Sequence, residues 1–439
     1  MNGALRETYG VSSPRFHNEA AAAAEEVLRW PAAKQEDQAE SGGRLRRVLL
    51  KAIAGAADVD PALVITATIA GALYGYSLLW SVLLAIPILI SVFGVSTRIG
   101  VEAKQGLVDL LRRHYGRAAA VGCVAIVLAI NMAMIVADLM AVTDAFSIIM
   151  QLPRMFFIAG AAFSVWYILI FRDYRRITRL LAVLALPLLI YIAAALLAHP
   201  HWPQVIRHSI IPSIPSGAGY PTAFIAILGC LLTPYVLVWQ TSSRRQDRVE
   251  PRAGRSIQHR AGAIVTTVLC YTIMIAAGTL LQTRHAADLT TRMAAEALTP
   301  AVGPLATIVF ALGIIGAGMV ALPVLIASMC HTVSEAMGWR SGLNENPWEA
   351  KRFYVLISGA VFVAGALNFV HINPVIVLYW SQILAGALTL PILVFVLLIS
   401  NDRRLMRTAN SWWQNFWIGA GGGSILCAAL LVLWWKLFR

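Results

Sequence analysis

The chain has 439 residues, of which 59% are hydrophobic and 13% are charged, and its mean hydropathy is +0.70. This composition indicates a protein with many membrane-spanning segments and excludes a soluble globular protein. The net charge of +13 raises the question of nucleic-acid binding, which the placement of the basic residues decides. An odd number of cysteines, all in apolar runs, argues against a disulfide framework: Cys123, Cys230, Cys270, Cys330 and Cys427.

Two regions are expected along the chain. Residues 1–45 are rich in Ala, Glu, Arg and Ser and lack a sustained apolar period, which predicts a disordered cytosolic tail. Residues 46–439 are expected to form a transmembrane domain. Its apolar segments long enough to cross a bilayer lie near residues 48–74, 77–97, 118–142, 155–171, 180–198, 221–242, 261–282, 305–334, 353–370, 374–399 and 415–435.

The basic residues fit these eleven spans. With the N-terminus in the cytoplasm, most of the 35 Lys and Arg fall in cytosolic segments, as the positive-inside rule requires. Those left on the outside are Arg154, Arg207, Arg284, Arg292, Lys436 and Arg439. The basic surplus therefore reports topology in a bacterial-type inner membrane, with a periplasmic C-terminus, and nucleic acid is not an expected partner.

Proline interrupts two of the spans. Pro61 follows Asp60 in the first span, and Pro234 lies in Thr233-Pro234-Tyr235 in the sixth. Proline removes a backbone donor and breaks the helical ladder. The two breaks occupy corresponding positions if spans 1–5 and 6–10 are inverted repeats, an architecture of secondary transporters in which broken helices form the binding site. Span 11 would then be an addition to an all-α, 5+5 fold.

Asp60 is the strongest candidate for a functional residue. A carboxylate inside a span is costly and is retained for function more often than for structure. Unwinding over Asp60–Leu63 would leave backbone carbonyls beside the carboxylate, and both favour a cation. Asp58 lies two residues earlier and could add a second carboxylate. A structural ion pair is the alternative, but no basic residue lies in the middle of any span.

The second break and two other spans supply further candidates. Unwinding at Pro234 would expose the Cys230 carbonyl and the Thr233 hydroxyl, which are hard oxygen ligands, although a proline can also be a structural kink. Asp138, isolated in the third span, is either a proton-relay group or a hydrogen-bond partner of neighbouring helices. Gln382 in span 10 and Gln240 in span 6 are explained equally well by hydrogen bonds between helices.

Several motifs resemble the natural resistance-associated macrophage protein (Nramp) family. The stretches from Gly55 to Leu63 and from Gly71 to Trp80 resemble its first span. Further similarities are Ala137-Asp138-Leu139, Ser381-Gln382 before Leu390-Pro391, and Asn401-Asp402-Arg403-Arg404-Leu405-Met406. The resemblance covers roughly residues 48–435. It implies a LeuT-like fold and transport of a divalent metal cation, which would be the substrate and not a cofactor. It implies no enzymatic activity.

The chain departs from the family at several positions. Ala62 and Leu63 stand where the family has Gly and Asn after Asp-Pro, and Thr233-Pro234-Tyr235 replaces Met-Pro-His. Gln240 occupies the place of a second histidine, and Ala141 that of a glutamate. By resemblance, the cation site would be lined by Asp60, the Cys230 carbonyl, Thr233 and Gln382. The Leu63 side chain cannot be a ligand.

These departures shape the expected chemistry. Loss of the thioether and of the asparagine makes the site harder, which resembles the branch of the family that moves Mg²⁺. Loss of the histidines and of the glutamate leaves Asp138 as the candidate for proton coupling. The expected function is alternating-access transport of Mn²⁺, Fe²⁺ or Mg²⁺. The alternatives are a transporter of the same fold for a small organic solute and a membrane sensor that does not transport.

Overall fold

The computed structural model describes residues 59–103, 106–171, 183–232, 252–281 (side chains from 264), 289–339, 348–370 and 372–438. Residues 53–439 group into one compact unit. Helices and turns make up the described residues, which contain no strand, and this confirms the all-α membrane fold.

The helices follow one another along the chain with short connections. They are α3 (Pro61–Tyr74), α4 (Leu79–Ala103), α5 (Leu107–His114), α6 (Gly116–Met150), α7 (Met155–Phe171), η1 (Leu186–Leu189), α9 (Ile190–Leu197), α10 (Trp202–Ile210), α11 (Gly219–Leu232), α13 (Arg252–Leu280), α14 (Thr291–Glu296), α15 (Thr299–Val302), η4 (Gly303–Leu305), α16 (Ala306–Met337), α17 (Lys351–Asn368), α18 (Pro374–Asn401) and α19 (Trp412–Phe438).

Each predicted span overlaps a helix of the structure. Five helical segments are individually long and apolar enough to cross a bilayer: Leu79–Ala103, Gly116–Met150, Thr299–Met337, Pro374–Asn401 and Trp412–Phe438. A sixth crossing results if Val183–Leu197 and Trp202–Ile210, which meet at 113°, count together. Shorter apolar helices such as α3 and α11 border residues outside the described ranges, so the total of eleven spans stays a prediction.

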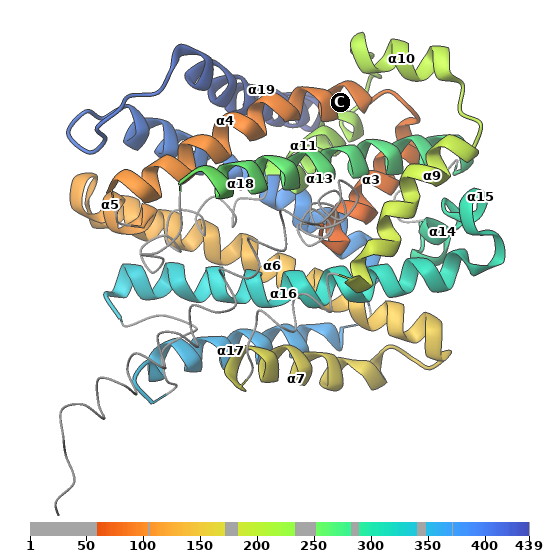
Figure 1. Ribbon diagram of the computed structural model, residues 1–439, viewed down its shortest axis with the longest axis horizontal. Coiled ribbons are helices and arrows are strands. Elements are labelled where there is room, and N and C mark those ends of the chain that lie inside the picture. Colours follow the sequence, from red (N-terminus) through yellow and green to blue (C-terminus); the bar gives the residue numbers. More distant parts are fainter. Residues whose placement is uncertain are drawn as a thin grey trace, which may run out of the picture. The chain divides into compact units, whose positions relative to one another are not determined.

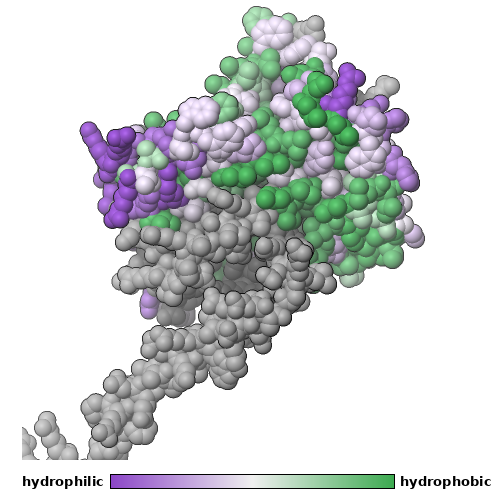
Figure 2. All heavy atoms as spheres, turned by 45° about the horizontal axis from the view of Figure 1, so that its top comes forward, coloured by the Kyte–Doolittle hydropathy of each residue, from purple (hydrophilic) through white to green (hydrophobic). Residues whose placement is uncertain are grey.

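The long helices run in a common direction, which defines the membrane axis. In Figure 1, α5 lies at one end of the bundle, and α10, α14 and α15 lie at the other. Figure 2 shows hydrophobic side chains over a broad area between hydrophilic edges. Large apolar side chains on the helix surfaces are exposed, among them Phe156 on α7 and Phe362 on α17. A bilayer would cover these side chains.

Helix α3 is the central element, and its ends follow from local sequence. Asp60 caps the N-terminus by accepting a hydrogen bond from the Leu63 N–H at 2.7 Å, and Pro61 occupies the first helical position, where no N–H is needed. The helix ends at Gly75, whose φ of +57° favours glycine. Every residue from Pro61 to Ala72 is buried, and the helix packs against α6, α11, α13 and α18.

Glycines let the helices around α3 approach closely. A Cβ on Gly71 would lie 2.9 Å from the Cβ of Ala277 on α13, and one on Gly278 would lie 3.1 Å from the Gly75 carbonyl carbon. On the other side, a Cβ on Gly386 of α18 would collide with the Ile225 carbonyl oxygen of α11. Small residues at such contacts allow tight van der Waals packing in membranes, where apolar burial alone drives little association.

The close packing expected for the glycines of span 8 is also present. Cβ atoms on Gly313 and Gly316 would collide with Leu188 of η1 and with the Leu184–Ala185 backbone. Gly318 meets α6 in the same way, through Val142. These glycines therefore position α16 against its neighbours.

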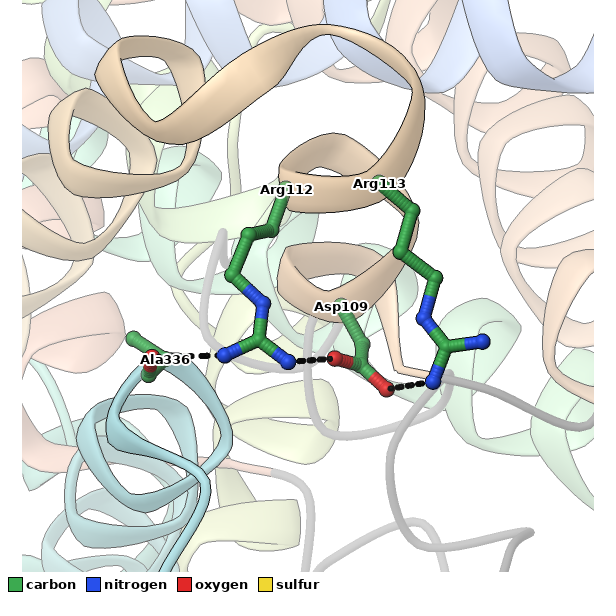
Figure 3. A network of polar contacts seen from close by, with 4 residues as sticks. All are labelled: Asp109, Arg112, Arg113 and Ala336. Atoms are coloured by element: carbon green, nitrogen blue, oxygen red, sulfur yellow. Dashed lines mark hydrogen bonds and ion pairs between the residues drawn. The ribbon is translucent and has the colours of Figure 1, made fainter.

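A polar network fixes α5 to one end of α16 (Figure 3). The Asp109 carboxylate accepts from Arg112 at 2.9 Å and lies 3.6 Å from Arg113. Arg112 also donates to the Ala336 carbonyl at 3.2 Å. Because the Arg112 side chain is 37% exposed, these ion pairs contribute only roughly 0–1 kcal/mol each. Their role is to orient α5 at the end of the bundle that the basic residues predict to be cytosolic.

The α11–α18 contact predicts a sharp difference between two identical substitutions. Gly386→Ala should destabilise the protein by roughly 1–3 kcal/mol, because the added methyl has no space beside the Ile225 carbonyl. Gly423→Ala on α19 is the matched control, since nothing lies within 4 Å of its Cβ position. Thermal melting of both variants in detergent measures the difference, and equal melting temperatures would contradict this view of the contact.

Candidate metal site

Asp60 lies at the break before α3. Its Oδ1 accepts the Leu63 N–H, whereas its Oδ2 is buried without a hydrogen-bond partner, and the residue is only 3% exposed. The break is shorter than expected, since Pro61, Ala62 and Leu63 already form the first helical turn. The reason is local: an aspartate cap followed by proline starts a helix. The carboxylate therefore sits at the positive end of α3, which stabilises its charge.

Leu63 contributes only its backbone to this arrangement. Its side chain is buried in the core, and its N–H holds Asp60 in place. Leucine carries no donor atom, so it cannot replace the amide that the resembled family places here.

Asp138 approaches Asp60 from the middle of α6. It is fully buried, and neither carboxylate oxygen has a hydrogen-bond partner. The two carboxylates interact electrostatically, and Asp138 faces the backbone amide of Ala62 at a geometry looser than a hydrogen bond. Gly318 of α16 supports both, because its missing side chain leaves room for Pro61, whose Cγ lies 3.2 Å from the Cβ position.

Helices α11 and α18 bring Cys230 beside Gln382. A Cβ on Gly229 would collide with the Gln382 carbonyl oxygen, so the two backbones touch one residue away from Cys230. The Gln382 side chain is fully buried, and neither its oxygen nor its nitrogen has a hydrogen-bond partner. The Cys230 thiol donates to the Ile227 carbonyl at 3.1 Å and also interacts with Cys270 of α13 and with Asp60.

Unsatisfied polar atoms thus gather at the start of α3. Each buried polar group without a partner costs roughly 1–3 kcal/mol, and an unpaired charge costs more. No lysine or arginine is buried within the described ranges, which leaves Asp60 and Asp138 without a described basic partner. A cation, a proton or ordered water at this point would satisfy the oxygens of Asp60, Asp138 and Gln382.

The donors at this point are mixed in kind. The described residues contain no group of three or more His, Cys, Asp and Glu side chains arranged to hold a metal ion. An ion bound here would therefore rely on carboxylate, amide, backbone carbonyl and water oxygens together. That combination suits hard divalent cations, which accept neutral oxygen ligands and retained water.

The other predicted site residues cannot be placed. Asp58, Thr233, Pro234, Tyr235 and Gln240 lie outside the described residues. One neighbour of the site was not predicted, namely Cys270, which is fully buried on α13. Its sequence surroundings are uniformly apolar, and only the packing of α13 against α3 reveals its position.

Comparison with known proteins gives consistent matches across the membrane domain. The sequence profile of the Natural resistance-associated macrophage protein-like family matches residues 51–435. A protein of Acidiphilium cryptum named divalent metal cation transporter MntH is 26% identical over 87% of this chain and 88% of its own length. A Granulibacter bethesdensis protein of the same name is 23% identical over 87% of this chain and 86% of that relative.

A solved structure shows the same fold. The crystal structure of the Eremococcus coleocola manganese transporter in complex with an aromatic bis-isothiourea substituted compound has a TM-score of 0.65. The match covers 89% of this chain and 87% of that chain at 16% identity, which supports similarity of fold alone. Together with the profile match over most of its length, these comparisons show that the chain belongs to the Nramp family.

Proposed function

We propose that this protein is a secondary transporter that moves a divalent metal cation across the membrane by alternating access. Members of its family are transporters and not enzymes, and relatives along most of its length are named as divalent metal cation transporters. The observation that carries the proposal is the buried group formed by Asp60, Asp138 and Gln382, whose oxygens lack protein partners. Isolated acids inside a membrane bundle mark ion pathways.

In this mechanism, the cation binds at the break before α3. The free Oδ2 of Asp60 and the Gln382 amide oxygen are ligands from the described residues, with the Cys230 carbonyl next to them. Thr233 and Asp58 complete the proposed set. Leu63 keeps Asp60 oriented through its N–H, so the second carboxylate oxygen faces the ion without a change of rotamer. Retained water would fill the remaining coordination positions.

Asp138 would carry the coupled proton. Two carboxylates in electrostatic contact repel each other when both are charged, and this repulsion weakens when one of them takes a proton or when a cation enters. Binding of the cation at Asp60 therefore changes the proton affinity of Asp138 through charge alone. This linkage needs no histidine, which makes it compatible with the residues present in this chain.

Aromatic residues close the end of α3 opposite Asp60. Tyr74 and Tyr220 make an edge-to-face contact with ring centroids 5.4 Å apart. The Tyr220 hydroxyl donates to the Ser77 carbonyl at 2.9 Å and accepts from the Trp80 indole at 3.0 Å. With the N-terminus in the cytoplasm of a bacterial-type inner membrane, this end faces the periplasm. The proposed conformation is therefore one in which the periplasmic entrance is shut.

Asp60→Asn tests the binding role. We expect Mn²⁺ uptake into liposomes containing the variant to fall to the level of empty liposomes, because the amide keeps the cap oxygen but removes the charge. Asp402→Asn is the matched control, since Asp402 also accepts a backbone N–H, from Arg404 at 2.8 Å, but lies at the end of α18. Its uptake should equal that of the wild type. Retained uptake in Asp60→Asn would refute the proposed site.

Asp138→Asn tests the proton role. In the wild type, a pH gradient that is acidic outside should accelerate Mn²⁺ uptake, because protonation of Asp138 accompanies the inward step. In Asp138→Asn that acceleration should disappear while Mn²⁺ still binds, since the variant keeps Asp60. Uptake at several external pH values, with binding measured by calorimetry, checks both expectations. An unchanged response to the gradient would assign the proton to another group.

The metal itself is decided by a comparison in the same liposomes. The altered motifs favour a harder ion, so we expect Mg²⁺ uptake that depends on Asp60 and that competes with Mn²⁺ uptake. Mn²⁺ uptake that excess Mg²⁺ does not inhibit would place the protein with manganese and iron transporters instead.

A further inference from the structure

We infer that the thiols of Cys230 and Cys270 form a binding site for a soft, thiophilic divalent cation, adjoining Asp60. The inference deepens the proposed function, because it adds donors to the same site that neither the family motifs nor the sequence predict. It rests on the proposed function only for the idea that the cation is transported. The binding of a soft cation by the two thiols stands on the arrangement of α3, α11 and α13.

The helix contacts bring the two cysteines to nearby levels along α3. Helix α11 runs antiparallel to α3, because Gly219 packs at the Tyr74 hydroxyl and its chain descends from there toward Gly229. Cys230 follows Gly219 by eleven residues, which is about 16 Å along a helix. The same distance measured back from Tyr74 along α3 reaches Leu63. Cys230 therefore lies about one helical turn from Asp60 in height.

Cys270 reaches a similar level from the other side. Helix α13 runs parallel to α3, since Gly71 packs beside Met274 and Gly75 beside Gly278. Cys270 precedes Met274 by one turn, which places it level with Ala67 and about one turn from Cys230 in height. The thiols of Cys230 and Cys270 meet across this step, and Cys230 also interacts with Asp60.

Both thiols are buried and free. Cys230 and Cys270 each have no exposed surface, and neither is in a disulfide. The Cys230 thiol keeps its proton on the Ile227 carbonyl at 3.1 Å, a weak hydrogen bond within its own helix. Nothing in that arrangement prevents the sulfur from exchanging its proton for a metal ion.

The chemistry of this group is softer than that of the oxygen ligands alone. Thiolate sulfur selects soft and borderline metals over Mg²⁺, Ca²⁺ and Mn²⁺. One divalent cation held by both sulfurs would release two protons, one from each thiol, and would leave the charge of the Asp60 carboxylate to neutralise the complex further. The loss of the family's thioether at Thr233 is thus offset by sulfur supplied from two other positions.

Cadmium binding tests the inference on the full-length protein in detergent. A variant with Cys123→Ala, Cys330→Ala and Cys427→Ala keeps only the two thiols in question. We expect Cd²⁺ alone to produce a saturable ultraviolet sulfur-to-metal charge-transfer band at one ion per chain. Adding Cys270→Ser should weaken Cd²⁺ affinity roughly 10- to 100-fold, the range typical of sites that lose a supporting residue. Adding Asp60→Asn should also weaken it.

Each outcome bears on the inference. Absence of the band in a variant that still takes up Mn²⁺ would refute the thiol site, as would a band of equal strength after Cys270→Ser. Cd²⁺ affinity unaffected by Asp60→Asn would separate the thiols from the carboxylate and refute a shared ion. If the triple variant does not fold, the same comparison is made between the wild type and Cys270→Ser. A Cd²⁺ band without Mn²⁺ or Mg²⁺ uptake in the wild type would keep the site and refute the transport function.

Discussion

Two buried carboxylates that no described basic residue neutralises set the demands on this structure. Asp60 and Asp138 interact electrostatically, and the described helices bury no lysine or arginine. In a medium of low polarity such an arrangement is expensive unless a cation or a proton compensates it. The free energy that other proteins obtain from a fixed ion pair is here left open to exchangeable ions. A binding site that must also release its ion requires such an incomplete compensation.

The surrounding helices supply the rigidity that this group lacks. Glycine contacts hold α3 against α13 and α11 against α18 so closely that backbone atoms touch. Because the Asp60 cap and the Gly318 contact depend on the first turn of α3, the site is positioned by backbone and not by side-chain networks. Exchange of an ion therefore requires movement of whole helices, since single side chains have little room to move. This coupling between site and helix packing is what alternating access needs.

Sequence patterns were sufficient for the class of fold and insufficient for the details of the site. Apolar length and basic loops located helices such as α7 at the predicted residues, because bilayer thickness and charge act on every span alike. The extent of the break at Asp60 was predicted incorrectly, since the helix-starting effect of Asp60-Pro61 outweighs the expected unwinding up to Leu63. The meeting of Cys230 and Cys270 was not predictable, because it depends on how α11 and α13 both pack against α3.

The hardness of the site illustrates how a missing motif can mislead. Replacement of a thioether by Thr233 suggests a site built only from oxygen, provided that ligands come from the family's positions. The structure places two sulfur atoms next to the same carboxylate from Cys230 and Cys270. Ligand character is a property of the atoms that meet in space, and helices can supply those atoms from any level that faces the break. Selectivity in this protein would then depend on whether the ion favours the oxygens of Asp60 and Gln382 or the neighbouring thiols.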